Sequence, residues 1–197
     1  MSQQIEAMIL AGGLARRMRG EDKGLIELLD KPMIVHVIDR LRNQVNKIRI
    51  NANKNQERYA AFGFEVFADQ LQGFLGPLAG IYSGLAECQT ELMLVVPCDC
   101  PLLPLDLAQR MQQQLLAEDA DLAVATDGER DHSVVLLLKP KLRQSLKTYL
   151  ESGQRRVESW FEDFKVARVS FADQPNAFVN VNTQEQKQQL AAVISKA

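Results

Sequence analysis

A short stretch near the N-terminus combines two adjacent glycines with clustered positive charge. Gly12 and Gly13 end an apolar run, and without a Cβ they let main-chain N–H groups approach an anion closely. The cations that follow within one loop are Arg16, Arg17, Arg19 and Lys23. A solvated basic loop after a glycine turn is the plainer alternative. Because the whole chain has a formal net charge of only −2, we predict that this local cluster binds phosphate groups.

The stretch matches neither of two common phosphate-binding fingerprints. Gly20 is followed by Glu21 rather than by Lys and Ser or Thr, which excludes a Walker loop. The third glycine of the dinucleotide-binding fingerprint is also missing after Gly12 and Gly13. A connection this long in a compact protein is usually functional. The sequence therefore favours anion binding by a loop of another kind.

A carboxylate that could hold a divalent cation follows a second apolar run. Asp99 comes after the apolar residues 92–96 and lies between Pro97 and Pro101, which restrict its backbone. Magnesium is usually held by one or two carboxylates together with substrate phosphates and water. The alternative is that Asp99 caps a helix that starts near Pro104. Opposite a phosphate-binding loop in the same sheet, the interpretation as a metal ligand is favoured.

Further polar residues and glycines are expected at the same edge of the sheet, where ligands of open α/β sheets gather. Asp69 could be a second metal ligand, a partner for ligand hydroxyls or a turn residue. Asn51 and Asn53 could read the edge of a nucleobase or stabilise a turn. Gly76 and Gly80 flank a helix start, where free N–H groups favour an anion and a base can lie close.

The cysteines and histidines do not form a recognisable catalytic or metal cluster. Cys98 and Cys100 have no second Cys or His pair at zinc spacing, so we expect them to pack in the core. His36 is expected to be structural, whereas His132 could line the pocket of a second substrate. The chain has three cysteines and no export signal, which indicates reduced thiols and a cytoplasmic protein.

These residues need an α/β framework, which the apolar periodicity predicts. The expected strands are residues 7–11, 47–51, 65–68, 92–96 and 122–126, with a return strand at 134–138 and an extended segment at 166–171. The expected helices are residues 32–44, 55–62, 78–88, 105–116, 140–150, 157–164 and 183–195. We predict a Rossmann-like three-layer sandwich over residues 1–197 as a single domain, with a mainly parallel sheet and a small antiparallel element. Residues 14–24 are expected to form a polar loop.

The bulk composition excludes several kinds of partner. No uncharged apolar run reaches about 18 residues, so we expect no membrane span. The net charge of −2 offers no broad basic surface for nucleic acid or anionic lipid. We expect a monomer that binds small anionic molecules through a few local cations.

Taken in chain order, several motifs resemble the molybdenum cofactor guanylyltransferases of the MobA type, within the nucleotidyltransferase superfamily. The motifs are Leu10-Ala11-Gly12-Gly13, Arg16-Arg17-Met18, Asp22-Lys23-Gly24, Asn51-Ala52-Asn53, Gly76-Pro77-Leu78-Ala79-Gly80, Pro97-Cys98-Asp99, Asp127-Gly128-Glu129-Arg130-Asp131-His132 and Phe178-Val179-Asn180-Val181-Asn182-Thr183. The glycine loop alone indicates only the superfamily, and the ordered set indicates the family.

The resemblance implies transfer of GMP from GTP to the terminal phosphate of molybdopterin, with release of pyrophosphate and with Mg²⁺ as cofactor. The nucleotide-binding positions that it implies are Leu10, Ala11, Gly12, Gly13, Lys23, Asn51, Asp69 and Asp99, with Asp99 as the metal ligand. Asn180 and Asn182 match a motif associated with the pterin side of the cleft. It also implies contact with other molybdenum cofactor biosynthesis proteins and with acceptor molybdoenzymes. Related cytidylyltransferases tend to have Leu-Ala-Ala-Gly where this chain has Leu-Ala-Gly-Gly, which favours guanine.

The chemistry expected from this resemblance is in-line attack by a phosphate oxygen of molybdopterin on the α-phosphorus of GTP. That oxygen is ionised at neutral pH, so the protein must position two polyanions and stabilise charge rather than supply a base. Arg17 and Lys23 would neutralise the triphosphate, and Asp99 would hold the magnesium ion. The alternatives are a cytidylyltransferase or sugar-phosphate nucleotidyltransferase of the same superfamily and, from another class, a GTP-binding regulator without catalysis.

Overall fold

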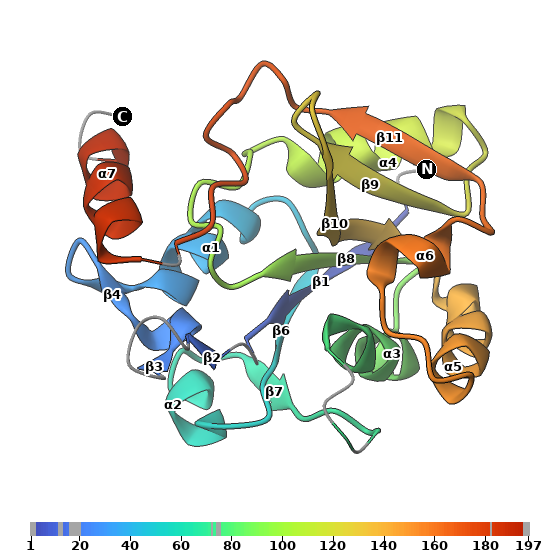
Figure 1. Cartoon of the computed structure of the whole chain (residues 1–197), viewed down its shortest axis with the longest axis horizontal. Helices are drawn as coiled ribbons and strands as arrows, with labels where there is room; N and C mark the ends of the chain where they lie inside the picture. The colour runs from blue at the N-terminus through green and yellow to red at the C-terminus, as the bar shows by residue number, and fades with distance from the viewer. Residues whose placement is uncertain are drawn as a thin grey trace.

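The computed structural model describes residues 3–11, 14–15, 21–71, 73, 76–181 and 183–194. Its centre is a seven-stranded sheet with the order β11-β9-β10-β8-β1-β6-β7 (Figure 1). The strands are β1 (Ile5–Leu10), β6 (Lys47–Asn51), β7 (Glu65–Phe67), β8 (Leu92–Pro97), β9 (Leu122–Thr126), β10 (Asp131–Leu138) and β11 (Val166–Ser170). All pairs are parallel except those of β10, which runs antiparallel to both β8 and β9. The predicted α/β class with a small antiparallel element is confirmed.

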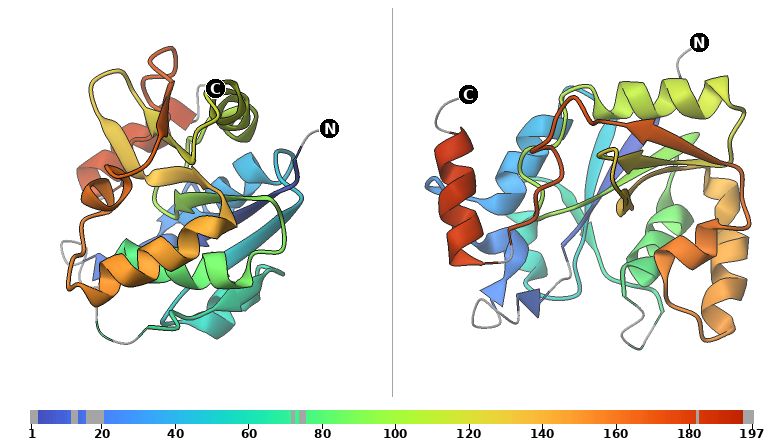
Figure 2. Two further views of the ribbon diagram at one scale, coloured as in Figure 1. Left: turned by 90° about the vertical axis from the view of Figure 1, so that its right-hand side faces the viewer. Right: turned by 45° about the horizontal axis from the view of Figure 1, so that its top comes forward.

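Helices cover both faces of this sheet, as Figure 2 shows. One layer contains α1 (Met33–Leu41), α2 (Gln56–Ala60) and α4 (Leu107–Ala117), and the other contains α3 (Pro77–Glu87), α5 (Arg143–Glu151) and α6 (Val157–Phe161). The remaining helices are η1 (Lys23–Leu25), η2 (Pro140–Leu142) and α7 (Gln184–Ile194). Within the described part of the chain, no helix is long and apolar enough to cross a membrane.

The two layers follow from the alternation of side chains along the buried strands. In β1, Ile5, Ala7 and Ile9 pack with the layer of α1, α2 and α4, whereas Met8 packs with α3. In β9, Ala123 and Ala125 face the first layer and their neighbours face the second. Because successive side chains of a strand point to opposite faces, a continuous apolar run builds two cores at once.

Short hairpins replace part of the loop that the sequence predicted over residues 14–24. Within this range β2 (Leu14–Ala15) pairs with β3 (Glu21–Asp22), and after it β4 (Glu27–Leu28) pairs with β5 (Lys31–Pro32). Leu29 and Asp30 join the second pair with φ angles of 51° and 61°, as a two-residue hairpin turn requires. The prediction of a polar loop did not include β2, β3 and η1, because elements of two or three residues show no periodicity that a sequence could reveal.

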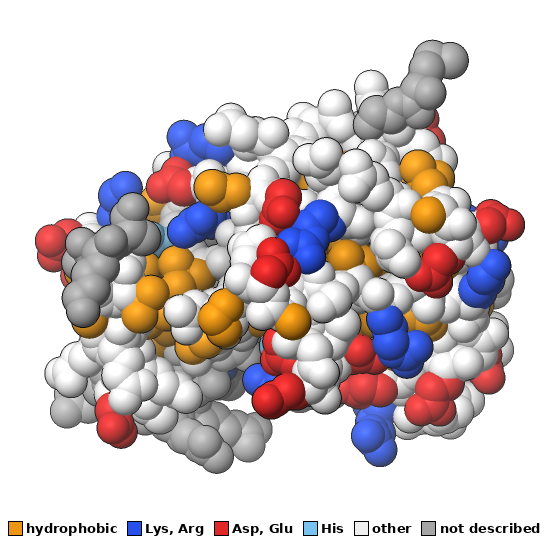
Figure 3. Space-filling model, turned by 90° about the horizontal axis from the view of Figure 1, so that it is seen from above, with side chains coloured by type: hydrophobic (Ala, Val, Ile, Leu, Met, Phe, Trp, Pro, Cys, Tyr) orange, Lys and Arg blue, Asp and Glu red, His pale blue; other side chains and the backbone are white. Residues whose placement is uncertain are grey.

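Charged side chains of both signs are mixed on the surface seen in Figure 3, where no broad basic face appears. This view agrees with the composition, which contains 23 Lys and Arg residues and 25 Asp and Glu residues. Any strong preference for an anionic ligand must therefore come from a local site.

Candidate functional site

A cavity of about 520 Å³ opens at the carboxyl ends of β1, β6, β7 and β8. The chain runs outward from β1 to β6 and β7, and then returns to β8 on the other side of β1. Such a switch in strand order is where open α/β sheets bind ligands. The cavity is lined by Leu10, Lys23, Asn51, Asn53, Asp69, Gly76, Pro77, Gly80, Pro97, Cys98, Asp99, Val134 and Asn180. Most residues proposed from the sequence are thus brought together here.

Lys23 and Asp99 form an ion pair in this cavity. The Lys23 Nζ donates to Asp99 Oδ2 over 2.9 Å, and the two side chains are 20% and 10% exposed. The sequence predicted that they face each other across a cleft, and the structure places them in direct contact. Asp99 does not cap the following helix, because α4 begins at Leu107 and has Asp106 at its N-cap. Lys23 and Asp99 therefore neutralise each other, whereas the carboxylate of Asp69 is a further negative charge in the lining.

The main chain around Asp99 is fixed by neighbouring segments. The Cys98 N–H donates to Leu10 O over 3.1 Å, and the Val181 N–H donates to Asp99 O over 3.2 Å. The Cys100 thiol donates to Asn180 Oδ1 over 2.6 Å. Burial raises the pKa of both thiols, and the Asp99 charge adds to that shift. The prediction that these cysteines pack in the core is confirmed. The orientation of Asn180 by Cys100 was missed, because nothing in the sequence links two residues so far apart.

Two asparagines hold the carboxylate of Asp69. Asn51 Nδ2 donates to Asp69 Oδ1 over 3.0 Å, and Asn53 Nδ2 donates to Asp69 Oδ2 over 2.8 Å. In return, the Asp69 N–H donates to Asn53 Oδ1 over 2.9 Å. Both the nitrogen and the oxygen of the Asn53 side-chain amide are therefore hydrogen-bonded to Asp69. The network orients the Asp69 carboxylate at the cavity wall, and the sequence did not predict these contacts.

Gly80 lets the protein pack closely against itself beside the cavity. A Cβ at this position would lie 2.4 Å from Asn51 Oδ1 and 2.7 Å from Leu10 Cδ2. The sequence predicted close approach of a ligand at this glycine, whereas the structure shows that two lining side chains, Asn51 and Leu10, occupy the space. Gly76, at the N-cap of α3, has a φ of 67° that other residues adopt only with strain.

Part of the predicted site lies outside the described residues. Gly12, Gly13, Arg17 and Asn182 belong to this part, as do Arg16, Met18, Arg19 and Gly20. Ala11, which precedes the two glycines, is buried, and its N–H donates to Asn51 O over 2.8 Å. Leu14 then pairs with Asp22, so the chain enters and leaves this stretch near the cavity.

The lining residues fit a divalent cation that is bound together with phosphate groups. Among the described residues, no three His, Cys, Asp or Glu side chains are grouped to hold a metal by themselves. Asp99 nevertheless presents a carboxylate in the cavity, and Asp69 presents a second. Magnesium commonly binds one or two carboxylates and takes its other ligands from substrate phosphates and water.

His132 is not among the residues that line this cavity. Its Nε2 is 2.9 Å from Asp127 Oδ2, and its ring stacks on Phe178 with 4.4 Å between centroids. Burial lowers the pKa of His132, and the main-chain N–H groups of Arg130 and Glu129 lower the pKa of Asp127 to about 2. A neutral imidazole therefore supports Phe178 at neutral pH, two residues before Asn180.

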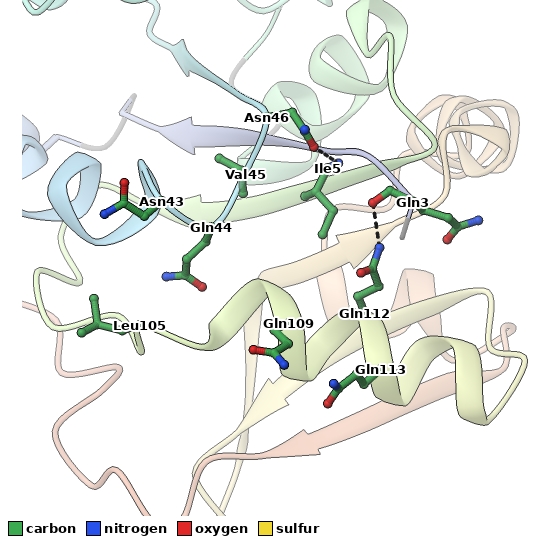
Figure 4. Close-up of a pocket in the computed structure, with 10 residues that line it drawn as sticks. All are labelled: Gln3, Ile5, Asn43, Gln44, Val45, Asn46, Leu105, Gln109, Gln112 and Gln113. Atoms are coloured by element: carbon green, nitrogen blue, oxygen red, sulfur yellow. Dashed lines mark hydrogen bonds between the residues drawn. The ribbon is translucent and has the colours of Figure 1, made fainter. Parts of the chain in front are cut away.

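A larger cavity of about 670 Å³ lies at the amino ends of β1 and β6 (Figure 4). It is lined by Gln3, Ile5, Asn43, Gln44, Val45, Asn46, Leu105, Gln109, Gln112 and Gln113. Two of its side-chain amides hydrogen-bond to the main chain at the start of β1: Asn46 Oδ1 accepts from the Ile5 N–H, and Gln112 Nε2 donates to Gln3 O (Figure 4). Its lining contains no charged residue, so the cavity of Lys23 and Asp99 is the candidate site for an anionic substrate.

Known proteins resemble this chain over almost all of its length. Residues 7–191 match the family described as MobA-like NTP transferase domain. A protein named molybdenum cofactor guanylyltransferase from Shewanella woodyi is 58% identical, with 100% of both chains covered. One of the same name from Shewanella sediminis is 59% identical, again with 100% of both chains covered.

Solved structures agree on the fold. A molybdopterin-guanine dinucleotide biosynthesis protein A from Archaeoglobus fulgidus has a TM-score of 0.82 at 17% identity, covering 98% of this chain and 100% of that one. A CMP:2-keto-3-deoxy-manno-octonic acid synthetase complexed with CTP has a TM-score of 0.75 at 13% identity, covering 98% of this chain and 99% of that one. At these identities, the likeness shows a shared fold.

Proposed function

This chain belongs to the family of MobA-like NTP transferase domains, and we propose that it transfers GMP from GTP to the terminal phosphate of molybdopterin, releasing pyrophosphate. The resemblance drawn from the sequence motifs is thus confirmed at the level of the family. The relatives that carry this activity in their names match the whole chain at 58% and 59% identity. The single structural observation that supports the assignment best is the Lys23–Asp99 ion pair at the switch point of the sheet.

Lys23 is proposed to bind the triphosphate and the departing pyrophosphate. Its ammonium group lies 2.9 Å from the carboxylate of Asp99. A triphosphate carries several negative charges, so it can compete with Asp99 for the ammonium group. The exchange would leave the Asp99 carboxylate available as a ligand. Charge developing on the leaving phosphates would then meet a cation already in place.

Asp99 is proposed to hold the divalent cation, with Asp69 as the second carboxylate in the cavity. A magnesium ion bound there with the substrate phosphates would polarise the α-phosphate and lower the repulsion between the two anionic substrates. The attacking phosphate oxygen is already ionised, so the residues in the cavity need not remove a proton. Arg17, which lies outside the described residues, is proposed to add a second positive charge to the triphosphate.

The sheet order suggests which side of the cavity each substrate occupies. Asn51 and Asp69 follow β6 and β7, on one side of β1, and we assign the nucleoside to this side together with Leu10 and Gly80. Asn180 lies in the cavity with Val134 of β10, on the other side of β8, and we assign the pterin to it. Asn182 is proposed to contribute to the same side. The two substrates would then meet above β1 and β8, beside Lys23 and Asp99.

Pyrophosphate release from GTP, measured with and without molybdopterin, tests this function. We expect release only when GTP, molybdopterin and a divalent cation are all present, and little release when CTP replaces GTP. Preference for CTP would identify a cytidylyltransferase, and turnover with a sugar phosphate would identify another branch of the superfamily. GTP binding without release under any of these conditions would indicate a regulator and refute the proposal.

A further inference from the structure

The segment that carries Lys23 is held from behind by the short helix α2. The Tyr59 hydroxyl forms a short hydrogen bond with Asp22 Oδ1. Asn55, at the N-cap of the same helix, donates from Nδ2 to Asp22 Oδ2 over 3.1 Å. Both oxygens of the carboxylate that precedes Lys23 are therefore engaged from one side.

The same hydroxyl also reaches the end of the first strand. Tyr59 is fully buried, and its oxygen lies 3.4 Å from Ala11 O. Ala11 and Asp22 stand on either side of the glycine and arginine stretch in the sequence. One buried phenol thus contacts the residue before this stretch and the residue at its end. Burial raises the pKa of Tyr59, so the hydroxyl keeps its proton and can serve as a donor.

Gly24 shows how closely Tyr59 packs against the main chain beside Lys23. A Cβ at residue 24 would lie 2.7 Å from the Tyr59 Oη and 3.3 Å from the Cys98 Cβ. The glycine is thus required by lack of space. The Asp22-Lys23-Gly24 motif has a physical explanation: Asp22 is anchored by Tyr59, Gly24 makes room for Tyr59, and Lys23 between them reaches Asp99.

We propose that Tyr59 is a positioning residue, which fixes the main chain of Asp22 so that the Lys23 ammonium is held in the cavity. Tyr59 does not line the cavity, whereas Lys23, next to its partner Asp22, does; the proposed route is therefore through Lys23 rather than through Ala11. A lysine side chain loses conformational entropy when it is ordered. If the backbone is already fixed, no backbone entropy is lost in addition when the phosphates bind. The inference rests on the proposed assignment of Lys23 to the triphosphate.

Tyr59→Phe tests the proposal because it keeps the buried ring and removes only the hydroxyl. Binding of GTP in the presence of Mg²⁺ is measured by titration calorimetry for the parent, Tyr59→Phe, Lys23→Ala and the double variant. We expect Tyr59→Phe to weaken binding about tenfold, the value of one hydrogen bond to a charged group. In the Lys23→Ala background, the same change should have no further effect, because the residue through which Tyr59 acts is gone.

Two further variants separate positioning from general stability. Tyr82→Phe removes another buried phenol oxygen, which accepts from Arg143 over 3.3 Å, and should leave GTP binding unchanged. Asp22→Ala removes the acceptor of the Tyr59 hydrogen bond and should weaken GTP binding as Tyr59→Phe does. This variant tests the same hydrogen bond if Tyr59→Phe does not fold. Asp22→Asn retains an acceptor oxygen and should restore most of the affinity.

The outcomes also separate this inference from the proposed function. If Lys23→Ala binds GTP like the parent, the assignment of the triphosphate site fails and the positioning role fails with it. If Lys23→Ala weakens binding but Tyr59→Phe does not, only the positioning role is overturned. Equal losses from Tyr59→Phe in both backgrounds would show a general structural effect and would likewise overturn it.

Discussion

Replacing Gly80 by alanine adds one methyl group at the wall of the candidate site. The new Cβ would lie 2.4 Å from Asn51 Oδ1 and 2.7 Å from Leu10 Cδ2, well inside van der Waals contact. Asn51 must then move, although it donates to Asp69 over 3.0 Å. Helix α3 continues through this position, so the backbone itself accepts alanine. The variant therefore changes the cavity wall without changing the fold.

Two opposing contributions determine the expected change in the free energy of unfolding. Overpacking costs about 1–3 kcal/mol, and the helix gains about 1 kcal/mol from replacing glycine by alanine. The free energy of unfolding should thus fall by roughly 0–2 kcal/mol. Loss of the Asn51–Asp69 hydrogen bond adds about 1 kcal/mol to the cost of forming the nucleotide site, which corresponds to about fivefold weaker GTP binding.

Gly84→Ala is a matched control in the same helix. Its Cβ would lie 2.3 Å from the sulfur of Met8 and 3.0 Å from that of Met93, and neither methionine lines the cavity. Methionine side chains are flexible, so the clash can relax away from the site. GTP affinity is measured by titration and stability by guanidinium denaturation. If Gly80→Ala binds GTP as tightly as Gly84→Ala does, our reasoning about Asn51 and Asp69 is refuted.

Further predictions concern the ion pairs and one histidine. Lys23→Ala should lose about 2–4 kcal/mol of transition-state stabilisation, measured as a fall in kcat/KM, and an unchanged kcat/KM would contradict its role. Asp99→Asn should need a higher magnesium concentration to reach half of its maximal rate, and an unchanged magnesium dependence would contradict its role as a metal ligand. Arg49→Met leaves the buried Glu6, whose side chain is 2% exposed, without the guanidinium 3.4 Å away, and should lower the free energy of unfolding by about 3–5 kcal/mol in guanidinium denaturation. Adding Glu6→Gln should recover much of that loss, whereas purely additive losses would argue against a buried charge. Because burial lowers the pKa of His132 in the folded state, the unfolded chain binds its proton first as pH falls below the ordinary value of 6.5. Stability should therefore decrease as the pH falls below about 6.5, less steeply in His132→Gln, and equal slopes would contradict this.

The sequence could predict the features that depend on local pattern. The apolar runs that end at Leu10 and Pro97 identified central strands, and the residues after them, Asp99 above all, fell at the edge where ligands bind. Lys23 was also assigned to the same site as Asp99, although 76 residues separate them. These predictions succeeded because parallel strands bring their carboxyl ends together.

The features that the sequence could not predict depend on contacts between distant side chains. Tyr59 lies in a helix of five residues, and only the folded chain shows that its hydroxyl reaches Asp22. Cys100 was expected to pack and does so, but its hydrogen bond to Asn180 depends on the path of the last segment. The reason for Gly80 likewise became clear only from the position of Asn51 on the neighbouring strand.

A crystal structure of the protein with GTP and Mg²⁺ is the most direct test of the central claim. We predict that the triphosphate lies in the cavity at the carboxyl ends of the strands, with the Lys23 ammonium on phosphate oxygens instead of Asp99 Oδ2. The carboxylate of Asp99 should then face the metal ion. A nucleotide bound elsewhere, with the Lys23–Asp99 ion pair intact at 2.9 Å, would contradict the account.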